Sequence, residues 1–117
     1  MFMNNFIKEQ PYFVCQWNAA FALKFENGYT VDVGFTSLHH CNNYHADRDI
    51  NPQHYGTIYG CNNGEVAVLD PNHNLVTNKI LRHMERFDWI NGDDVLDYAT
   101  PNQMAEIIAY VSKLKGE

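Results

Sequence analysis

Basic residues are scarce in this 117-residue sequence: 8 Lys and Arg stand against 14 Asp and Glu, a formal net charge of −6 at pH 7. Binding to duplex nucleic acid needs clustered Lys and Arg to neutralise phosphates, so this shortage argues against such a module. It also excludes a polybasic membrane anchor. No apolar stretch reaches the roughly 18 residues of a membrane-spanning helix, and the first residues lack the order of a secretory signal. We therefore expect neither duplex nucleic acid nor a membrane as a partner.

Cysteine is sparse as well, with only Cys15, Cys41 and Cys61 in the chain. An odd number without CxxC spacing predicts reduced thiols in the cytoplasm rather than a disulfide framework. The sequence also lacks a Gly-rich phosphate loop, a GxSxG elbow and an HExxH motif. These absences favour a non-enzymatic protein without catalytic residues, and the length indicates one domain, residues 1–117.

Hydrophobic residues make up 45% of the chain, which is enough to build a core. The clearest local pattern in the sequence predicts a β-hairpin around Asn27-Gly28. A two-residue turn would place the apolar residues of the two strands on opposite faces. A three-residue loop at 26–28, with Gly28 left-handed, gathers them on one face, so we expect this register. The implied pairs are Phe25–Tyr29, Leu23–Val31 and Phe21–Val33.

Further strands are predicted on either side of the hairpin. An aromatic and β-branched run at 12–17 suits a strand, and 65–69 suits another. Residues 70–73 are those preferred in a type I turn, so we expect 75–77 to return as the partner strand. The apolar spacing between 79 and 92 fits either a short helix or an irregular excursion.

The C-terminal helix has the clearest start signal. Thr100 supplies an N-cap hydroxyl, Pro101 suits the first helical position, and Gln103 completes a capping box. An apolar stripe follows at helical spacing, formed by Met104, Ile107, Ile108, Val111 and Leu114. Because strands come first and a helix last, we expect an α+β fold: an antiparallel sheet of about four or five strands with a C-terminal helix packed on one face.

Histidines gather in a polar loop, residues 36–60, which holds four of the six in the chain. Imidazole together with the Cys41 thiolate could bind a transition metal, and Cys41 could be a nucleophile with a neighbouring histidine as its base. The spacing completes no zinc pattern, however, so we favour a solvated loop and expect no metal and no cofactor. The loop residues that we name as candidate binding residues are His39, His40, Cys41, Tyr44 and His45.

An acidic cluster precedes the C-terminal helix and consists of Asp88, Asp93, Asp94 and Asp97. Such a surface could meet a basic partner. Aspartate is also favoured in turns and near helix N-termini, and this is the interpretation that we prefer for the cluster. The candidate binding residues from this region are Asp88, Trp89, Asp93 and Asp94.

Three parts of the chain carry a resemblance: 26–31 (ENGYTV), 65–70 (EVAVLD), and 92–96 (GDDVL) followed by 100–108 (TPNQMAEII). In this order they resemble a family of small, mostly uncharacterised proteins of tailed bacteriophages. The resemblance implies an accessory protein in the host cytoplasm that binds and inhibits a host or anti-phage defence factor. Two alternatives stay open: a sponge that sequesters a cyclic nucleotide at a subunit interface, and a small cysteine-dependent enzyme.

Self-association is a further expectation from the N-terminal part of the sequence. We expect residues 1–10 to be an apolar arm that precedes the aromatic strand predicted at 12–17. Together they would make a sheet edge that a second copy could cover. A symmetric homodimer is the commonest way to cover such an edge, and it is the arrangement that we expect.

Overall fold

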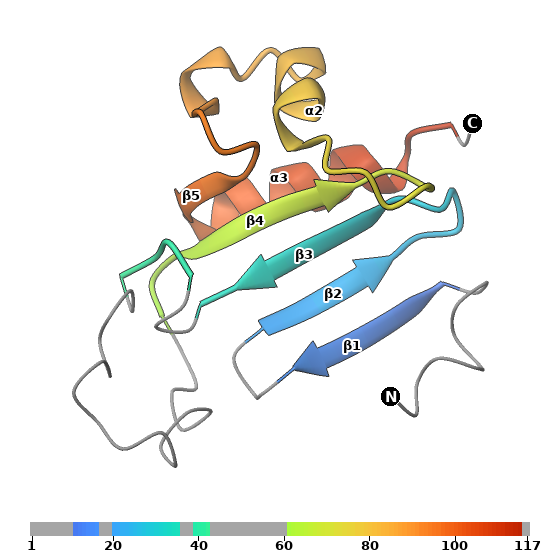
Figure 1. Ribbon diagram of the computed structural model, residues 1–117, viewed down its shortest axis with the longest axis horizontal. Coiled ribbons are helices and arrows are strands. Elements are labelled where there is room, and N and C mark those ends of the chain that lie inside the picture. Colours follow the sequence, from blue (N-terminus) through green and yellow to red (C-terminus); the bar gives the residue numbers. More distant parts are fainter. Residues whose placement is uncertain (1–10, 17–19, 36–38, 43–60, 116–117) are drawn as a thin grey trace.

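The computed structural model describes residues 11–16, 20–35, 39–42 and 61–115. Within these ranges five strands form one antiparallel sheet, and their order across the sheet follows their order along the chain (Figure 1). The strands are β1 (Tyr12–Gln16), β2 (Ala20–Lys24), β3 (Thr30–Gly34), β4 (Gly64–Leu69) and β5 (Leu96–Ala99). The helices are α2 (Thr77–His83), the 3₁₀ helix η2 (Phe87–Trp89) and α3 (Pro101–Ser112). The predicted α+β fold class is therefore confirmed.

The β2–β3 hairpin has the register that the sequence predicts. The strand pairs include Phe21–Val33 and Leu23–Val31. The loop is closed by two backbone hydrogen bonds of 2.9 Å, donated by Phe25 N to Tyr29 O and by Gly28 N to Phe25 O. Gly28 has a φ of 91°, a left-handed value that glycine adopts without the steric penalty of a Cβ. The three-residue loop thus keeps the apolar residues of both strands on one face.

Asn27 joins this loop to the end of α3. Its Oδ1 accepts a hydrogen bond from Tyr29 N at 3.0 Å. Its Nδ2 donates to the carbonyl oxygens of Val111 and Leu114, each at 2.8 Å. Backbone carbonyls at a helix C-terminus run short of donors within the helix. One side chain therefore shapes the hairpin loop and caps the C-terminal helix.

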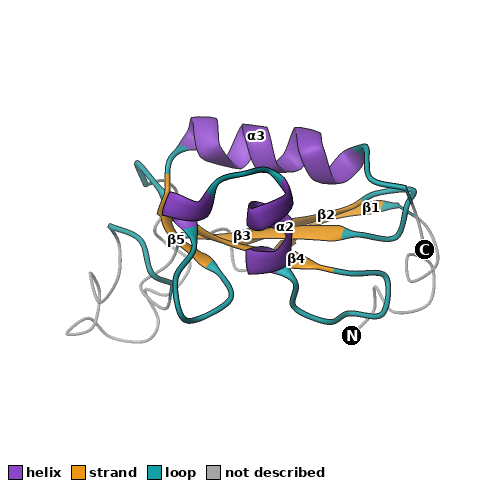
Figure 2. Cartoon of the chain, turned by 90° about the horizontal axis from the view of Figure 1, so that it is seen from above, coloured by secondary structure: helices purple, strands orange, loops and turns teal. Residues whose placement is uncertain are grey.

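Helix α3 begins with the predicted capping box and packs its predicted stripe on the sheet. Gln103 N donates to Thr100 Oγ1 at 3.1 Å, and Thr100 N donates to Gln103 Oε1 at 2.7 Å. Ile107 and Val111 are fully buried in the core. The strand residues in the same core cluster are Val31, Val33, Val66, Val68, Leu96 and Ala99. Figure 2 shows α3 as a separate layer on one side of the sheet.

The prediction of a strand at 75–77 is wrong. Leu75 forms one isolated bridge to Leu69, and Thr77 is already the first residue of α2. The preceding turn is as predicted, since His73 N donates to Asp70 O at 2.9 Å. The chain cannot continue as a strand because the buried Thr77 side chain turns back to β4, where its Oγ1 accepts from Val68 N at 2.8 Å. The Thr77 hydroxyl thus takes the place of the backbone carbonyl that a neighbouring strand would offer to Val68 N.

The stretch at 79–92, which the sequence left open between a helix and an irregular excursion, contains the greater part of α2 and then η2. Ile80 and Leu81 bury the apolar side of α2 in the core beside β4. None of the helices in the described ranges is long and apolar enough to cross a bilayer.

The two faces of the sheet differ in chemistry. Strand residues alternate between faces, so Val66 and Val68 of β4 point to α3 while Glu65 and Ala67 point away from it. Ala67 pairs with Asp32 of β3, which shares this second face. The face opposite α3 therefore carries acidic side chains, and the candidate site lies on it.

Candidate functional site: a histidine and two carboxylates on the sheet

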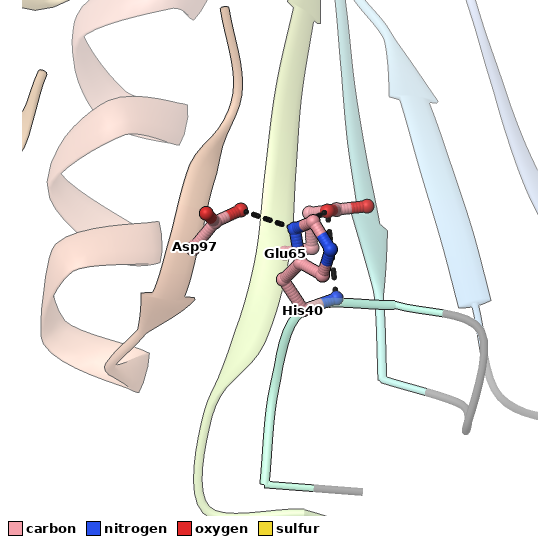
Figure 3. A group of neighbouring side chains, drawn as sticks. All are labelled: His40, Glu65 and Asp97. Atoms are coloured by element: carbon pink, nitrogen blue, oxygen red, sulfur yellow. Dashed lines mark hydrogen bonds and ion pairs between the residues drawn. The ribbon is translucent and has the colours of Figure 1, made fainter. Parts of the chain in front are cut away.

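His40, Glu65 and Asp97 come together on the face of the sheet opposite α3 (Figure 3). The His40 Nδ1 atom lies 3.1 Å from Asp97 Oδ1 and 3.2 Å from Glu65 Oε2. One ligand atom from each residue falls within 4.8 Å of the other two. Their side chains are 36%, 22% and 24% exposed for His40, Glu65 and Asp97, so the cluster is partly sheltered but open to solutes.

A β-bulge in β5 places Asp97 beside Glu65. Gly64 pairs with Ala99 and Val66 pairs with Leu96, so two β5 residues, 97 and 98, stand opposite Glu65 alone. Such a bulge bends a strand and changes the direction of its side chains. The second bulge residue, Tyr98, has a φ of 53°, a value that is uncommon for a bulky residue.

The segment 39–42 brings His40 to this bulge through its backbone. Tyr98 N donates to His40 O at 2.9 Å. His40 N donates to Glu65 Oε2 at 3.4 Å, a longer contact. At the other end of the segment, Asn42 N donates to Asn63 Oδ1 at 2.8 Å. The backbone of β5 and the side chains of Glu65 and Asn63 therefore hold the main chain of this segment and fix the place from which the imidazole projects.

A chain of hydrogen bonds supports Asp97 from the side of α2. Asn91 Nδ2 donates to Asp97 Oδ2 at 3.2 Å. Asn78 Nδ2 in turn donates to Asn91 O at 2.8 Å, and Asn78 N donates to Asp94 Oδ1 at 2.7 Å. The loop between η2 and β5 is thus tied to the first turn of α2, and Asp97 Oδ1 is left directed at His40.

Of the other candidate residues in the polar loop, the structure describes His39 and Cys41, and neither belongs to the cluster of His40, Glu65 and Asp97. The His39 ring lies over Gly34, where a Cβ would overlap it. Burial raises the pKa of Asp32, and the nearby His39 offsets part of that rise. Cys41 is only 1% exposed, which counts against a nucleophile that a substrate must reach. Tyr44 and His45 lie outside the described residues.

The acidic cluster is divided among separate contacts. Asp94 has the predicted helix-start role, but it serves α2 through Asn78 rather than α3. Asp88 and Asp93 are exposed. Trp89 packs against the core, with the Arg86 guanidinium 5.2 Å from its ring. Among the residues that the structure describes, Asp97 is the member of the acidic cluster that contacts a histidine.

Sequence reasoning missed Glu65 and did not pair Asp97 with His40. Glu65 stands in a strand rich in valine. Because side chains alternate between the two faces of a strand, the sequence does indicate that Glu65 lies on the opposite face from the apolar Val66. No such signal exists for Asp97, because the bulge that directs it depends on pairing between β4 and β5. The sequence suggested that the partners of His40 would be other residues of the polar loop. In the structure, His40 instead contacts Glu65 of β4 and Asp97 of β5.

A small apolar pocket lies between the sheet and the start of α3. Its lining residues are Phe21, Val33, Phe35, Cys61, Asn62, Asn63, Pro101 and Met104. Its volume is about 190 Å³. Sites for drug-sized ligands and cofactors have volumes of roughly 300–1,000 Å³, so this pocket does not suit such a ligand.

Comparison of the chain with protein-family models, with curated proteins and with solved structures gave no match.

Proposed function

We propose that this protein acts by binding another protein along β1, at one edge of the sheet. The observation that carries the proposal is the exposure of Phe13, which is 84% exposed in the middle of this strand. Full burial of a phenylalanine side chain contributes about 1.5–3 kcal/mol of favourable free energy. A partner that covers Phe13 would gain a contribution of this size to the free energy of binding. Scattered exposed apolar residues are common, but this one lies on an edge.

The place of Phe13 on the sheet explains its exposure. Phe13 pairs with Leu23, which pairs with Val31, so all three side chains share the face on which α3 packs. Val31 is fully buried in the core. Figure 1 shows α3 behind β4, and strands β3 and β2 lie between β4 and β1. The helix is therefore too far across the sheet to cover Phe13.

The backbone of β1 adds a second attraction for a partner. It is the outermost strand on its side of the sheet among the described residues. Edge strands present backbone donors and acceptors to an incoming strand, and peptide recognition by strand addition uses this geometry. A partner strand could thus form main-chain hydrogen bonds and bury Phe13 in one contact.

The chemistry of the partner follows from charge and from the resemblance. A net charge of −6 favours encounter with a basic surface, because long-range attraction raises the association rate. The resemblance to phage accessory proteins suggests that the partner is a host or defence-system protein, which this protein would inhibit. The burial of Cys41 makes the cysteine-enzyme alternative the weaker one.

The test compares two exposed phenylalanines on different elements. Tagged protein is used to capture partners from a bacterial host lysate, and Phe13→Ser is compared with Phe87→Ser; Phe87 is 63% exposed and lies in η2. We expect Phe13→Ser to lose a specific captured protein that wild type and Phe87→Ser retain. Light scattering after size exclusion follows self-association. If Phe13→Ser only converts a dimer to a monomer, β1 is the homodimer edge expected from the sequence, and the proposal that a different protein binds there fails.

A further inference from the structure

We propose that His40, Glu65 and Asp97 form a binding site for a divalent metal ion of the first transition row, such as zinc. The site lies on the opposite face of the sheet from Phe13, and the proposal is independent of partner binding. It uses one imidazole nitrogen and two carboxylate oxygens, each from a different segment of the chain. Nitrogen and oxygen donors of this kind are the usual ligands of such ions.

Two of the three distances between the ligand atoms are close to those of a coordinated ion. In a tetrahedral site with bonds of about 2.0–2.1 Å, neighbouring ligand atoms lie about 3.3–3.4 Å apart. His40 Nδ1 lies 3.1 Å from one carboxylate oxygen and 3.2 Å from the other. Small side-chain rotations would therefore open the cluster to an ion. Three protein ligands would leave a fourth position for water, which is the pattern of open rather than closed zinc sites.

A single N–H of His40 can serve only one of the two carboxylates well. The Nδ1 atom of His40 can carry one hydrogen, yet it faces an oxygen of Glu65 and an oxygen of Asp97 at nearly equal distances. One N–H cannot be well aligned with two separate acceptors. A dication would accept a lone pair from all three atoms and would also offset the repulsion between the two carboxylates.

The surroundings of the cluster resemble the support that metal ligands need. Asn91 Nδ2 holds Asp97 Oδ2 at 3.2 Å, which leaves Oδ1 to face the proposed ion. Asn78 holds the backbone of Asn91 from α2. Such outer hydrogen bonds orient ligating groups and contribute to metal affinity. The bulge at Tyr98 adds a backbone that is held in an unusual conformation beside a ligand.

The experiment titrates the purified full-length protein with zinc ion alone and follows binding by calorimetry and native mass spectrometry. Asp97→Asn and Glu65→Gln each remove one carboxylate charge with little change in shape. Asp93→Asn is the matched control, because Asp93 is exposed and outside the cluster. Circular dichroism confirms that all variants fold. Mn²⁺ and Mg²⁺ titrations compare ion types.

We expect wild type and Asp93→Asn to bind one zinc ion with equal affinity, and each cluster variant to bind it about tenfold or more weakly. Mg²⁺ should compete poorly, since it rarely uses imidazole ligands. The proposal is overturned if folded wild type binds no zinc at one-to-one stoichiometry. It is also overturned if zinc binds but Asp97→Asn and Glu65→Gln bind it as tightly as Asp93→Asn, because the ion would then occupy other histidines or cysteines.

Discussion

The Nδ1 atom of His40 lies 3.1 Å from Oδ1 of Asp97, although 57 residues separate the two along the chain. The same two segments are also joined by a backbone hydrogen bond, donated by Tyr98 N to His40 O. Side chain and main chain thus hold the segments together at one place. The contact requires Tyr98 to keep a left-handed conformation, which costs about 1–2 kcal/mol for an L residue other than glycine.

This strain gives the first prediction. At position 98, glycine should be more stable than alanine by about 1 kcal/mol, because alanine keeps the left-handed penalty and glycine does not. At Tyr110, inside α3, the order should reverse, since glycine in a helix is about 1 kcal/mol less stable than alanine. Urea unfolding of the four variants measures both differences. Alanine equal to or better than glycine at position 98 would show that the backbone there is not left-handed.

The elements that could be predicted from the sequence are those specified by residues close together in the chain. The hairpin register follows from Gly28 and the alternation of apolar residues, and the start of α3 follows from Thr100 to Gln103. The prediction of a strand at 75–77 was wrong because the conformation there depends on residues that are distant in the sequence. Thr77 contacts Val68 of β4, and the strand propensity of residues 75–77 gives no information on such a contact.

The candidate site could be predicted only in part. His40 was named, because histidines in a polar loop are visible in the sequence. Its partners come from β4 and from a bulge in β5, so their approach depends on strand pairing and on one unusual backbone angle. Neither Glu65 nor Asp97 lies near His40 in the sequence, so no local pattern marks them as its partners.

The second prediction concerns Asn27, whose amide nitrogen donates to two carbonyls at the end of α3. Asn27→Asp keeps the shape but removes both hydrogen bonds and places a negative charge at the negative end of the helix. We expect a loss of about 1–3 kcal/mol in the free energy of unfolding at neutral pH. Part of that loss should be recovered at low pH, where the new carboxyl is protonated. Denaturant unfolding at both pH values measures the change.

Asn102→Asp is the mirror-image control for this substitution. Asn102 is exposed in the first turn of the same helix, where a negative charge interacts favourably with the helix dipole. We expect it to be neutral or slightly stabilising. A similar loss in both variants would mean that asparagine-to-aspartate changes destabilise the protein through net charge, and not through the cap made by Asn27.

The third prediction uses two aspartates with opposite pKa shifts. Burial raises the pKa of Asp32 above its ordinary value, so its ionisation disfavours the folded state. Asp32→Asn should therefore stabilise the protein at neutral pH, and the gain should disappear as the pH falls below about 4, where the carboxyl is protonated in both states. Stability against pH, measured by urea unfolding of both proteins, tests this sign.

Asp70 supplies the comparison, because hydrogen bonds from the backbone of Asn74 and, more weakly, that of Asn72 lower its pKa. Its stabilising effect is present above the ordinary carboxyl pKa and is lost as the pH falls through the lowered value. Asp70→Asn should therefore destabilise the protein at neutral pH, and this deficit should shrink in acid. Parallel pH profiles for Asp32→Asn and Asp70→Asn would contradict at least one of the two assignments, because the predicted changes with pH have opposite signs.

The last prediction separates two glycines. Gly28 has a φ of 91°, and a Cβ added there would lie 3.0 Å from Cβ of Pro71. Gly28→Ala should therefore reduce the free energy of unfolding by about 1–2 kcal/mol, from backbone strain and from crowding against a rigid ring. Gly92 has no atom within 4 Å of such a Cβ and no left-handed φ. Gly92→Ala should be neutral or should stabilise by up to about 1 kcal/mol, because alanine has fewer unfolded conformations to lose. Thermal and urea unfolding of the two variants measure the contrast, and a Gly28→Ala protein as stable as wild type would rule out the left-handed loop that sets the hairpin register.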